Sequence, residues 1–389
     1  MAEFGHITCA GCGLLCDDVT VENSGDGVQL TPACGLGTEW FAERTRLSGG
    51  APAATVNGEP ADVESALARA AEMLRGARRP LLDGFAGATV EDARAAVALA
   101  DRLGALVTTR SLAAAWPGAP AVPLRGASST TLGEIRDRSR VVVIWREDPD
   151  TTHPRLLERL GFRSPSAERV LVVVDDRDTA TADRADLRLE WPRQRDLEAL
   201  VTLHALQRGR PVRPGDVGGL WERLVAVPHA AFIYGPRLTG GAGGQRRALA
   251  LHELIRALCH DRHVVTLELL SAAGTRSADD VLAWQSGYGG NVDFAGGHPN
   301  LVTATEPLDD VDVTLLVESA PAGAAEIALV SLPAGTDVEV WIRTAAAGVA
   351  ASGTAHRLDG VPLTLQAPQP DGAPTAAALL TRLLAELAR

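Results

Sequence analysis

The sequence of 389 residues contains no lysine, so all 37 of its basic residues are arginine. Chemistry that depends on a lysine amine, such as a Schiff base or a P-loop lysine on phosphates, is therefore excluded. Acidic residues outnumber basic ones, and the formal net charge is −12. A chain with this balance and no basic stripe is predicted not to bind nucleic acid.

Long hydrophobic runs are also missing, although 46% of the residues are hydrophobic. No stretch reaches the roughly 18 to 20 apolar residues that a membrane-spanning helix needs. The N-terminus has no basic start followed by an apolar segment, which a secretory signal would require. We therefore expect a cytoplasmic protein with no membrane contact.

Helix-like and strand-like segments alternate after a Gly- and Cys-rich start that ends in a break at 48–52. Apolar spacing predicts an amphipathic helix at about 61–76, and the continuous apolar runs at 141–145 and 170–174 are typical of buried parallel strands. This alternation predicts an α/β fold with two doubly wound parallel-sheet domains behind a small Cys-rich lobe. The expected domains are 1–52 (a four-cysteine metal-binding lobe), 53–135 together with about 270–389 (an α/β domain) and 136–269 (a second, Rossmann-like domain).

Four of the five cysteines form a compact pattern. Cys9, Cys12 and Cys16 have the spacing C-x2-C-x3-C, and Cys34 follows after an excursion of seventeen residues. Glycines within the first group allow a tight turn, so the pattern suits a 4Fe-4S cluster. A closed structural zinc site and unconnected thiols are the alternatives, while disulfides are disfavoured in the cytoplasm. We predict Cys9, Cys12, Cys16 and Cys34 as metal ligands and Cys259 as a small buried hydrophobe.

Other polar motifs give weaker signals. Asp175 and Asp176 follow the strand predicted at 170–174, a position that can bind a ribose or pterin tail, but the favoured interpretation is a loop carboxylate that caps a helix or pairs with Arg177. The H-E-x-x-R string at 252–256 breaks the two-histidine zinc motif. Because no nucleophile elbow or carboxylate pair is recognised either, no catalytic residue is assigned.

Several ordered motifs resemble one family along nearly the whole chain. They are C-A-G-C-G-L-L-C-D-D-V at 9–19, T-L-G-E-I-R-D-R-S-R-V-V-V-I-W at 131–145, H-P-R at 153–155, V-V-V-D-D-R-D-T-A-T-A-D-R-A-D at 172–186, W-Q-S-G-Y-G-G-N-V-D-F at 284–294 and G-V-A-A-S-G-T-A-H-R-L-D at 348–359. Together they resemble the B subunit of formylmethanofuran dehydrogenase, a member of the molybdopterin oxidoreductases. The resemblance implies a molybdopterin-oxidoreductase-like fold, here without a C-terminal barrel because a helix is expected at 374–389.

Members of that family bind a tungsten or molybdenum pterin, and a cysteine or selenocysteine soon after a glycine holds the metal. The matching glycine here is Gly84, and Val90 stands where the ligand is expected. A valine side chain has no donor atom. The resemblance therefore implies that molybdopterin is absent and that the redox site is lost.

The resemblance also extends to a homologous assembly of bacterial methylotrophs, the formyltransferase/hydrolase complex, in which the corresponding subunit lacks the pterin centre. The leading hypothesis is a non-catalytic structural subunit of this hetero-oligomer, in tetrahydromethanopterin-linked oxidation of formaldehyde to formate. The implied partners are a zinc amidohydrolase-like A subunit, a C subunit and a formyltransferase D subunit, with a methanofuran-like carrier met only indirectly. The rival hypotheses are an active formylmethanofuran dehydrogenase subunit with a molybdenum or tungsten pterin, and an iron-sulfur electron-transfer module.

Overall fold

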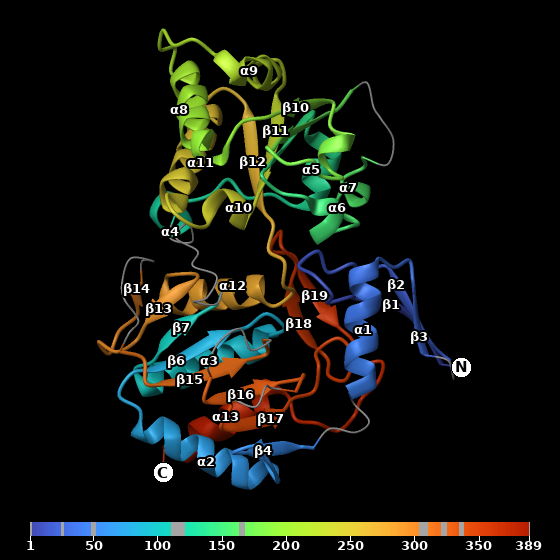
Figure 1. Cartoon of the computed structure of the whole chain (residues 1–389), viewed down its shortest axis with the longest axis vertical. Helices are drawn as coiled ribbons and strands as arrows, with labels where there is room; N and C mark the ends of the chain where they lie inside the picture. Colours follow the sequence, from blue (N-terminus) through green and yellow to red (C-terminus); the bar gives the residue numbers. More distant parts are fainter. Residues whose placement is uncertain are drawn as a thin grey trace. The chain divides into compact units, whose positions relative to one another are not determined.

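The computed structural model describes residues 2–24, 27–47, 52–109, 121–162, 168–302, 310–319, 325–333 and 338–388. Most of the break expected at 48–52 therefore lies outside the described residues. Contacts divide the chain into two compact units, unit 1 (Met1–Ala114 and Ala272–Arg389) and unit 2 (Ala115–Ser271), which Figure 1 shows in sequence colours. The first 52 residues are grouped with unit 1.

Residues 115–135, expected in the first α/β domain, are grouped with unit 2. The physical reason is local pairing, because the Thr266 N–H donates to the Ser128 carbonyl at 2.7 Å and Ser129 forms a parallel bridge with Thr266. Backbone hydrogen bonds of this kind attach a segment firmly to the sheet that it joins.

Unit 1 starts with a small antiparallel sheet and a helix. The sheet has the order β1 (Ala2–Ile7), β2 (Val19–Ser24), β3 (Gly27–Thr31), and α1 (Gly35–Leu47) follows it. A second antiparallel pair near the end of the chain consists of β18 (Gly353–His356) and β19 (Pro362–Leu365). Leu15, from the loop between β1 and β2, packs with Ala355 and Leu365 of this pair, so the two segments share one apolar cluster.

The main sheet of unit 1 has nine strands among the described residues. Its centre is parallel, in the order β7 (Leu106–Thr108), β6 (Pro80–Gly84), β15 (Val313–Val317), β16 (Ile327–Val330), β17 (Val340–Arg343). Antiparallel strands flank it, namely β14 (Asn300–Leu301) and β13 (Asn291–Asp293) at one edge and β4 (Ala54–Val56) and β5 (Glu59–Ala61) at the other. The direction in which strands are added reverses between β6 and β15, which makes that pair the topological switch point.

Four helices of unit 1 belong to one continuous apolar core with the sheet: α2 (Val63–Gly76), α3 (Val90–Leu103), α12 (Thr275–Ser286) and α13 (Ala376–Leu387). Leu82 and Leu315 face this core, whereas their neighbours Leu81 and Leu316 pack in separate clusters. This alternation follows from the two-residue period of a strand.

Unit 2 contains a parallel sheet in the order β10 (Leu187–Leu189), β9 (Val170–Val174), β8 (Val141–Trp145), β11 (His229–Tyr234), β12 (His263–Glu268). In Figure 1, α8 (Asp196–Gln207), α9 (Gly218–Val225) and α11 (Gly244–Leu258) lie on one side of it, and α5 (Leu132–Arg138), α6 (Pro149–Thr152) and α7 (Leu156–Arg159) on the other. The remaining elements are α4 (Ala121–Arg125), α10 (Pro236–Thr239) and the 3-10 turns η2 (Ala182–Arg184), η3 (Arg193–Arg195) and η4 (Gly215–Val217). Its switch point lies between β8 and β11.

The predicted α/β class with parallel sheets is confirmed, and the apolar runs at 141–145 and 170–174 are central strands, buried along nearly their whole length. The helix predicted at about 61–76 is α2, whose N-cap Asp62 accepts a hydrogen bond from the Ser65 N–H at 2.8 Å. Within the described segments, every helix is too short or too polar to cross a lipid bilayer.

Candidate metal centre and adjoining cavity

The four predicted metal ligands lie in the N-terminal part of unit 1. Cys9, Cys12 and Cys16 occupy the loop between β1 and β2, and the Cys9 N–H donates to the Cys16 carbonyl at 2.8 Å, which closes the loop. Cys34 stands directly before α1, where its carbonyl accepts the Thr38 N–H at 3.1 Å. None of the four forms a disulfide, and the three loop cysteines are buried.

Two glycines hold this loop and the start of α1 together. A Cβ on Gly11 would lie 3.0 Å from the Cα of Gly37, so the two backbones approach at van der Waals distance. A Cβ on Gly37 would lie 3.0 Å from Cys9 Sγ and 3.7 Å from Cys34 Sγ. The sulfur atoms of Cys9, from the loop, and of Cys34, before α1, therefore both lie beside Gly37, at a place that a side chain there would fill.

The electrostatics of this place favour a cation. Burial raises the pKa of Cys12 to about 12, and the charges of Cys16, Cys9 and Cys34 contribute to the rise. The Cys12 thiol therefore stays protonated without a metal, chiefly because its buried thiolate would lose solvation. A bound metal takes the place of the protons, so metal binding and proton release are linked. The four thiols and the free space beside Gly37 fit a metal centre.

A cavity of about 190 Å³ adjoins this loop and lies at the switch point of the main sheet. Ala86 and Gly87, after β6, and Glu318 and Ser319, after β15, form one wall. The opposite wall comes from the N-terminal part of the chain, with residues of the cysteine loop and two side chains of α1. The carboxyl ends of parallel strands at a switch point are where open α/β sheets bind ligands.

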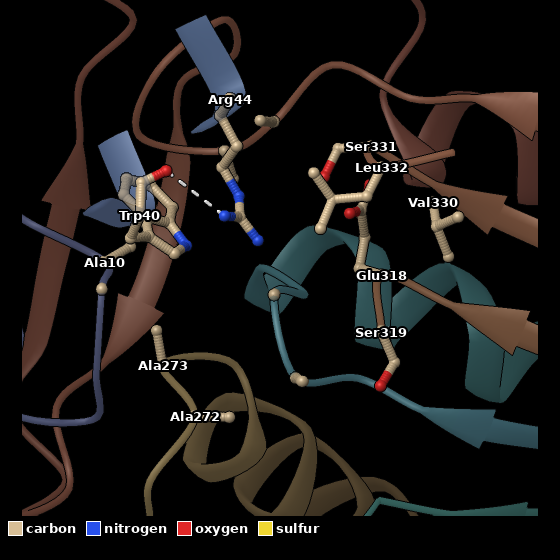
Figure 2. Close-up of a pocket in the computed structure, with 15 residues that line it drawn as sticks. Ala10, Trp40, Arg44, Ala272, Ala273, Glu318, Ser319, Val330, Ser331 and Leu332 are labelled. Atoms are coloured by element: carbon tan, nitrogen blue, oxygen red, sulfur yellow. Dashed lines mark hydrogen bonds between the residues drawn. The ribbon is translucent and has the colours of Figure 1, made fainter. Parts of the chain in front are cut away.

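Two charged side chains reach this cavity from opposite walls. Figure 2 shows the guanidinium of Arg44 extending from α1 toward the strand ends, with its Nη1 donating to the Trp40 carbonyl at 3.3 Å. Glu318 faces it from the end of β15, and burial, together with the charge of Asp92, raises the pKa of Glu318 to about 8. Glu318 has a φ of 44°, a left-handed conformation that is uncommon outside glycine and that often marks functional positions.

The loop after β6 offers no thiolate to a metal. Gly84 adopts a φ of 108°, and a Cβ there would lie 2.6 Å from the Cβ of Ser319, so glycine is required. Val90 is the first residue of α3 and packs in the apolar core of unit 1. The cavity itself is smaller than the roughly 300 to 1,000 Å³ of a typical cofactor site. These residues do not fit a pterin metal held by a protein thiolate.

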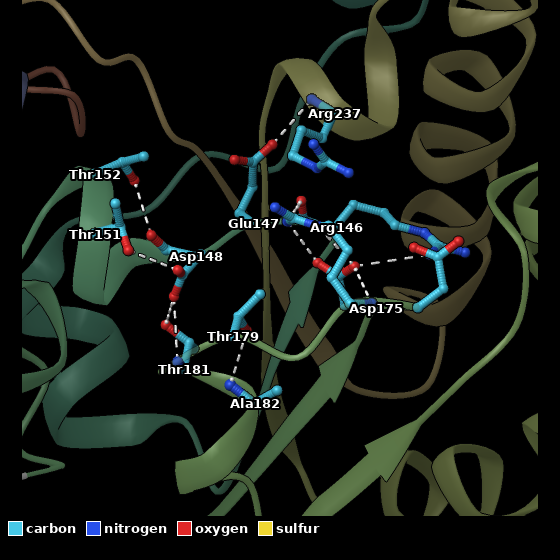
Figure 3. Close-up of polar contacts among 12 residues, drawn as sticks. Arg146, Glu147, Asp148, Thr151, Thr152, Asp175, Thr179, Thr181, Ala182 and Arg237 are labelled. Carbon is cyan, nitrogen blue, oxygen red and sulfur yellow. Dashed lines mark hydrogen bonds and ion pairs between the residues drawn. The ribbon is translucent and has the colours of Figure 1, made fainter.

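The carboxyl edge of the sheet in unit 2 carries a second polar cluster (Figure 3). Asp175 forms an ion pair with Arg177 at 2.8 Å, as expected from the sequence, and Asp176 lies 2.9 Å from Arg146. Arg146 is fully buried and also pairs with Asp196 at 2.9 Å. These carboxylates are used in internal ion pairs.

The crevice at the switch point of unit 2 is filled by a carboxyl group. Glu147 Oε1 accepts the Arg237 N–H at 3.0 Å and would lie 2.8 Å from a Cβ on Gly235. Burial raises the pKa of Glu147 to about 7. A nucleotide at this point would have to displace the Glu147 side chain.

Two further expectations concern α11. The H-E-x-x-R string does not build a site, since His252 is buried beside the Tyr234 hydroxyl and Glu253 pairs with Arg256 at 2.5 Å. Cys259 is exposed rather than buried, so that prediction was wrong. It caps the helix end, where its thiol donates to the Val264 carbonyl at 3.1 Å, and the alternating Leu and Ala pattern could not reveal where the helix stops.

Arg44 and Glu318 were not predicted from the sequence. One signal was available for Glu318, because it directly follows the apolar run Val313–Val317, and a polar residue at the end of a buried parallel strand marks the ligand-binding edge of a sheet. No such signal marks Arg44, because it lies within helix α1 and does not follow a buried strand.

Comparison with known proteins gives relatives over most of the chain. The sequence is 27% identical to the B subunit of a tungsten-containing formylmethanofuran dehydrogenase from Methanocaldococcus jannaschii, over 93% of this chain and 92% of the relative. It is 28% identical to the corresponding Methanococcus maripaludis protein, over 94% of each chain. It is 28% identical to the Fhc B subunit of the formyltransferase/hydrolase complex from Methylorubrum extorquens, over 64% of this chain and 67% of the relative. No family model matches the sequence.

Solved structures agree with these relatives. A chain in the crystal structure of the Methylorubrum extorquens formyltransferase/hydrolase complex with methylofuran matches with a TM-score of 0.72 and 26% identity, over 86% of this chain and 99% of that chain. Acetylene hydratase from Pelobacter acetylenicus shares the fold, with a TM-score of 0.61 and 11% identity over 99% of this chain and 70% of that enzyme. The family resemblance predicted from the sequence motifs is thereby confirmed. This chain is a homologue of the B subunits of formylmethanofuran dehydrogenase and of the formyltransferase/hydrolase complex.

Proposed function

We propose that this chain is the B subunit of a formyltransferase/hydrolase complex and that its role there is structural rather than catalytic. The observation that carries the proposal is the likeness to a chain of the Methylorubrum extorquens complex, at a TM-score of 0.72 over 99% of that chain. The loop between Gly84 and Val90 supports the structural role, because it contains no cysteine that could ligate a pterin metal.

The partners follow from this assignment. They are a zinc amidohydrolase-like A subunit, a C subunit and a formyltransferase D subunit in the cytoplasm. The D subunit transfers a formyl group from a tetrahydromethanopterin carrier to a methanofuran-like carrier, and the A subunit releases formate by hydrolysis. Both steps belong to the tetrahydromethanopterin-linked oxidation of formaldehyde to formate. The related crystal structure was solved with methylofuran. In our proposal this chain meets the carrier only through its partners.

We also propose a molybdopterin-oxidoreductase-like arrangement without bound molybdopterin. Its domains are a lobe at 1–52, an α/β domain at 53–135 with about 270–389, and a Rossmann-like domain at 136–269, which Ser128 and Ser129 contact through Thr266. The fold shared with acetylene hydratase supports the arrangement.

Cys9, Cys12, Cys16 and Cys34 are proposed to hold a 4Fe-4S cluster, with structural zinc as the alternative. A cluster can carry single electrons when bound. The cysteines themselves tie the loop before β2 to the start of α1, since the sulfur atoms of Cys9 and Cys34 lie 3.0 Å and 3.7 Å from the Cβ position of Gly37. In this proposal the bound metal stabilises the folded N-terminal lobe and takes no part in a reaction.

A specific observation favours a second candidate, an active dehydrogenase subunit. The two tungsten-containing relatives align with 93% and 94% of this chain, more than the 64% matched by the Fhc sequence. This candidate requires a pterin metal held without a protein thiolate from the loop after β6.

The experiment is purification of the tagged chain from its native host, followed by identification of the co-purifying chains and metal analysis. We expect amidohydrolase-like and formyltransferase chains to co-purify, with about four iron atoms per chain for one cubane and with no stoichiometric tungsten or molybdenum. Tungsten or molybdenum at one atom per chain would contradict the structural role and support the dehydrogenase. An iron-sulfur signal that changes oxidation state during turnover would instead identify an electron-transfer module.

A further inference from the structure

Three side chains at the amino edge of the sheet in unit 2 point at one another. Glu134 comes from α5, His229 is the first residue of β11 and His263 is the first residue of β12. The two histidines are register partners in adjacent parallel strands, and their ring centroids lie 4.8 Å apart. Among the residues that the structure describes, these three form the group whose ligand atoms lie close enough together to hold one metal ion.

Two of the three separations between these groups match metal ligation. Glu134 Oε1 lies 3.3 Å from Nε2 of His229 and 3.3 Å from Nε2 of His263. A tetrahedral metal with bonds of about 2.0 to 2.1 Å to nitrogen and oxygen separates its ligand atoms by about 3.3 to 3.4 Å. In this structure the contact between Glu134 and His229 is a hydrogen bond of 3.3 Å, longer than the usual length of about 2.7 to 3.2 Å.

Each inner ligand is held in place by a second side chain. His229 Nδ1 lies 3.0 Å from the hydroxyl of Ser139, which can accept the Nδ1 proton and so leave the lone pair of Nε2 free for a metal. Thr130 Oγ1 donates to Glu134 Oε2 at 3.0 Å, so the other oxygen, Oε1, faces the histidines. Supporting hydrogen bonds of this kind are typical of built metal sites.

We propose that Glu134, His229 and His263 form a divalent metal site, suited to Zn²⁺, at the amino edge of the sheet in unit 2. The side chain of His263 is 60% exposed, so the fourth coordination position is open to water. This site shares no residue with the cysteine quartet and lies at the opposite edge of the unit 2 sheet from the strand ends that precede Glu147 and Asp175, and it does not depend on the proposed function.

The test is zinc binding by the full-length protein, with the cysteine quartet occupied as isolated. Isothermal titration with Zn²⁺ alone compares the wild type with three variants, His263→Gln, Glu134→Gln and His260→Gln. His260 is the matched control, because it is an 88% exposed histidine three residues from His263 and is not part of the group.

We expect the wild type to bind one zinc ion beyond the content of the quartet, and His260→Gln to bind it equally well. His263→Gln and Glu134→Gln should each weaken the affinity by at least about tenfold, since even supporting residues of metal sites contribute about 10 to 100-fold. Co²⁺ at the proposed site should give visible bands without the intense sulfur-to-metal absorption of the cysteine site. The proposal is overturned if the wild type takes up no additional zinc, or if His263→Gln binds it as tightly as the wild type does.

Discussion

At the scale of single residues, Gly37 leaves room for the sulfur atoms of Cys9 and Cys34 because it has no side chain. We predict that Gly37→Ala lowers the metal content, because the new Cβ would lie 3.0 Å from Cys9 Sγ and force the sulfur to move by a few tenths of an ångström. Iron and acid-labile sulfide per chain measure the loss.

Gly35→Ala is the matched control in the same helical turn, since a Cβ there meets no atom within 4 Å. This control should keep its full metal content. Equal iron in both variants would show that the centre does not use the space at Gly37.

Glu318 predicts a pH dependence of stability. Its folded pKa of about 8 lies above its ordinary value of 4.5, so the folded state holds the proton more tightly than the unfolded state does. The stability that this group contributes is complete below about pH 4.5 and is lost as the pH rises through about 8.

The substitution Glu318→Gln removes this titration and keeps the shape of the side chain. We expect the melting temperature of the variant to gain on that of the wild type between about pH 5 and pH 9. Parallel melting curves across this range would contradict the prediction.

At the scale of elements, one carboxylate caps two helices of unit 1. Asp92 Oδ2 accepts the Thr89 N–H at 2.8 Å in the capping box of α3, and Asp92 Oδ1 accepts the Ala377 N–H at 2.7 Å at the start of α13. Both helices therefore lose a cap when this side chain is removed.

We predict that Asp92→Ala lowers the free energy of unfolding by about 3 kcal/mol, because buried donors lose their acceptor at about 1 to 3 kcal/mol each. Asp101→Ala, at an exposed position of the same helix, should change it by less than about 0.5 kcal/mol. Denaturant unfolding followed by circular dichroism checks both values, and equal effects would refute the capping role.

The elements also show what could be predicted from the sequence. The strands at 141–145 and 170–174 are visible as apolar runs because both faces of a parallel strand are buried. The cysteine pattern can be recognised in the sequence because Cys9, Cys12 and Cys16 lie close together and only Cys34 is more distant. The cavity between Arg44 and Glu318 was not predicted, since its walls come from distant parts of the chain and no local pattern records that they meet.

The same limit applies to the metal site proposed in unit 2. Glu134, His229 and His263 become neighbours only through the pairing of β11 with β12 and the position of α5. The sequence separates Glu134 from His229 by 95 residues and from His263 by 129, so no ligand spacing could reveal the group.

At the scale of the whole molecule, unit 2 is a continuous stretch of chain with a core of its own. We predict that residues 115–271 fold when expressed alone, because domains with a separate hydrophobic core are independently stable as a rule. A single cooperative thermal transition in circular dichroism would support this, and a gradual, non-cooperative signal loss would contradict it.

The pairing of β6 with β15 has a consequence for synthesis on the ribosome. One edge of β6 pairs with β7 early in synthesis, but its other edge finds hydrogen-bond partners only at 313–317, whereas the last strand of unit 2 ends at Glu268. Domains generally fold as units while the chain emerges from the ribosome. Unit 2 can therefore complete its fold while the edge of β6 that pairs with β15 is still unpaired. During that interval the apolar edge of β6 is the part of the nascent protein that most needs protection by chaperones.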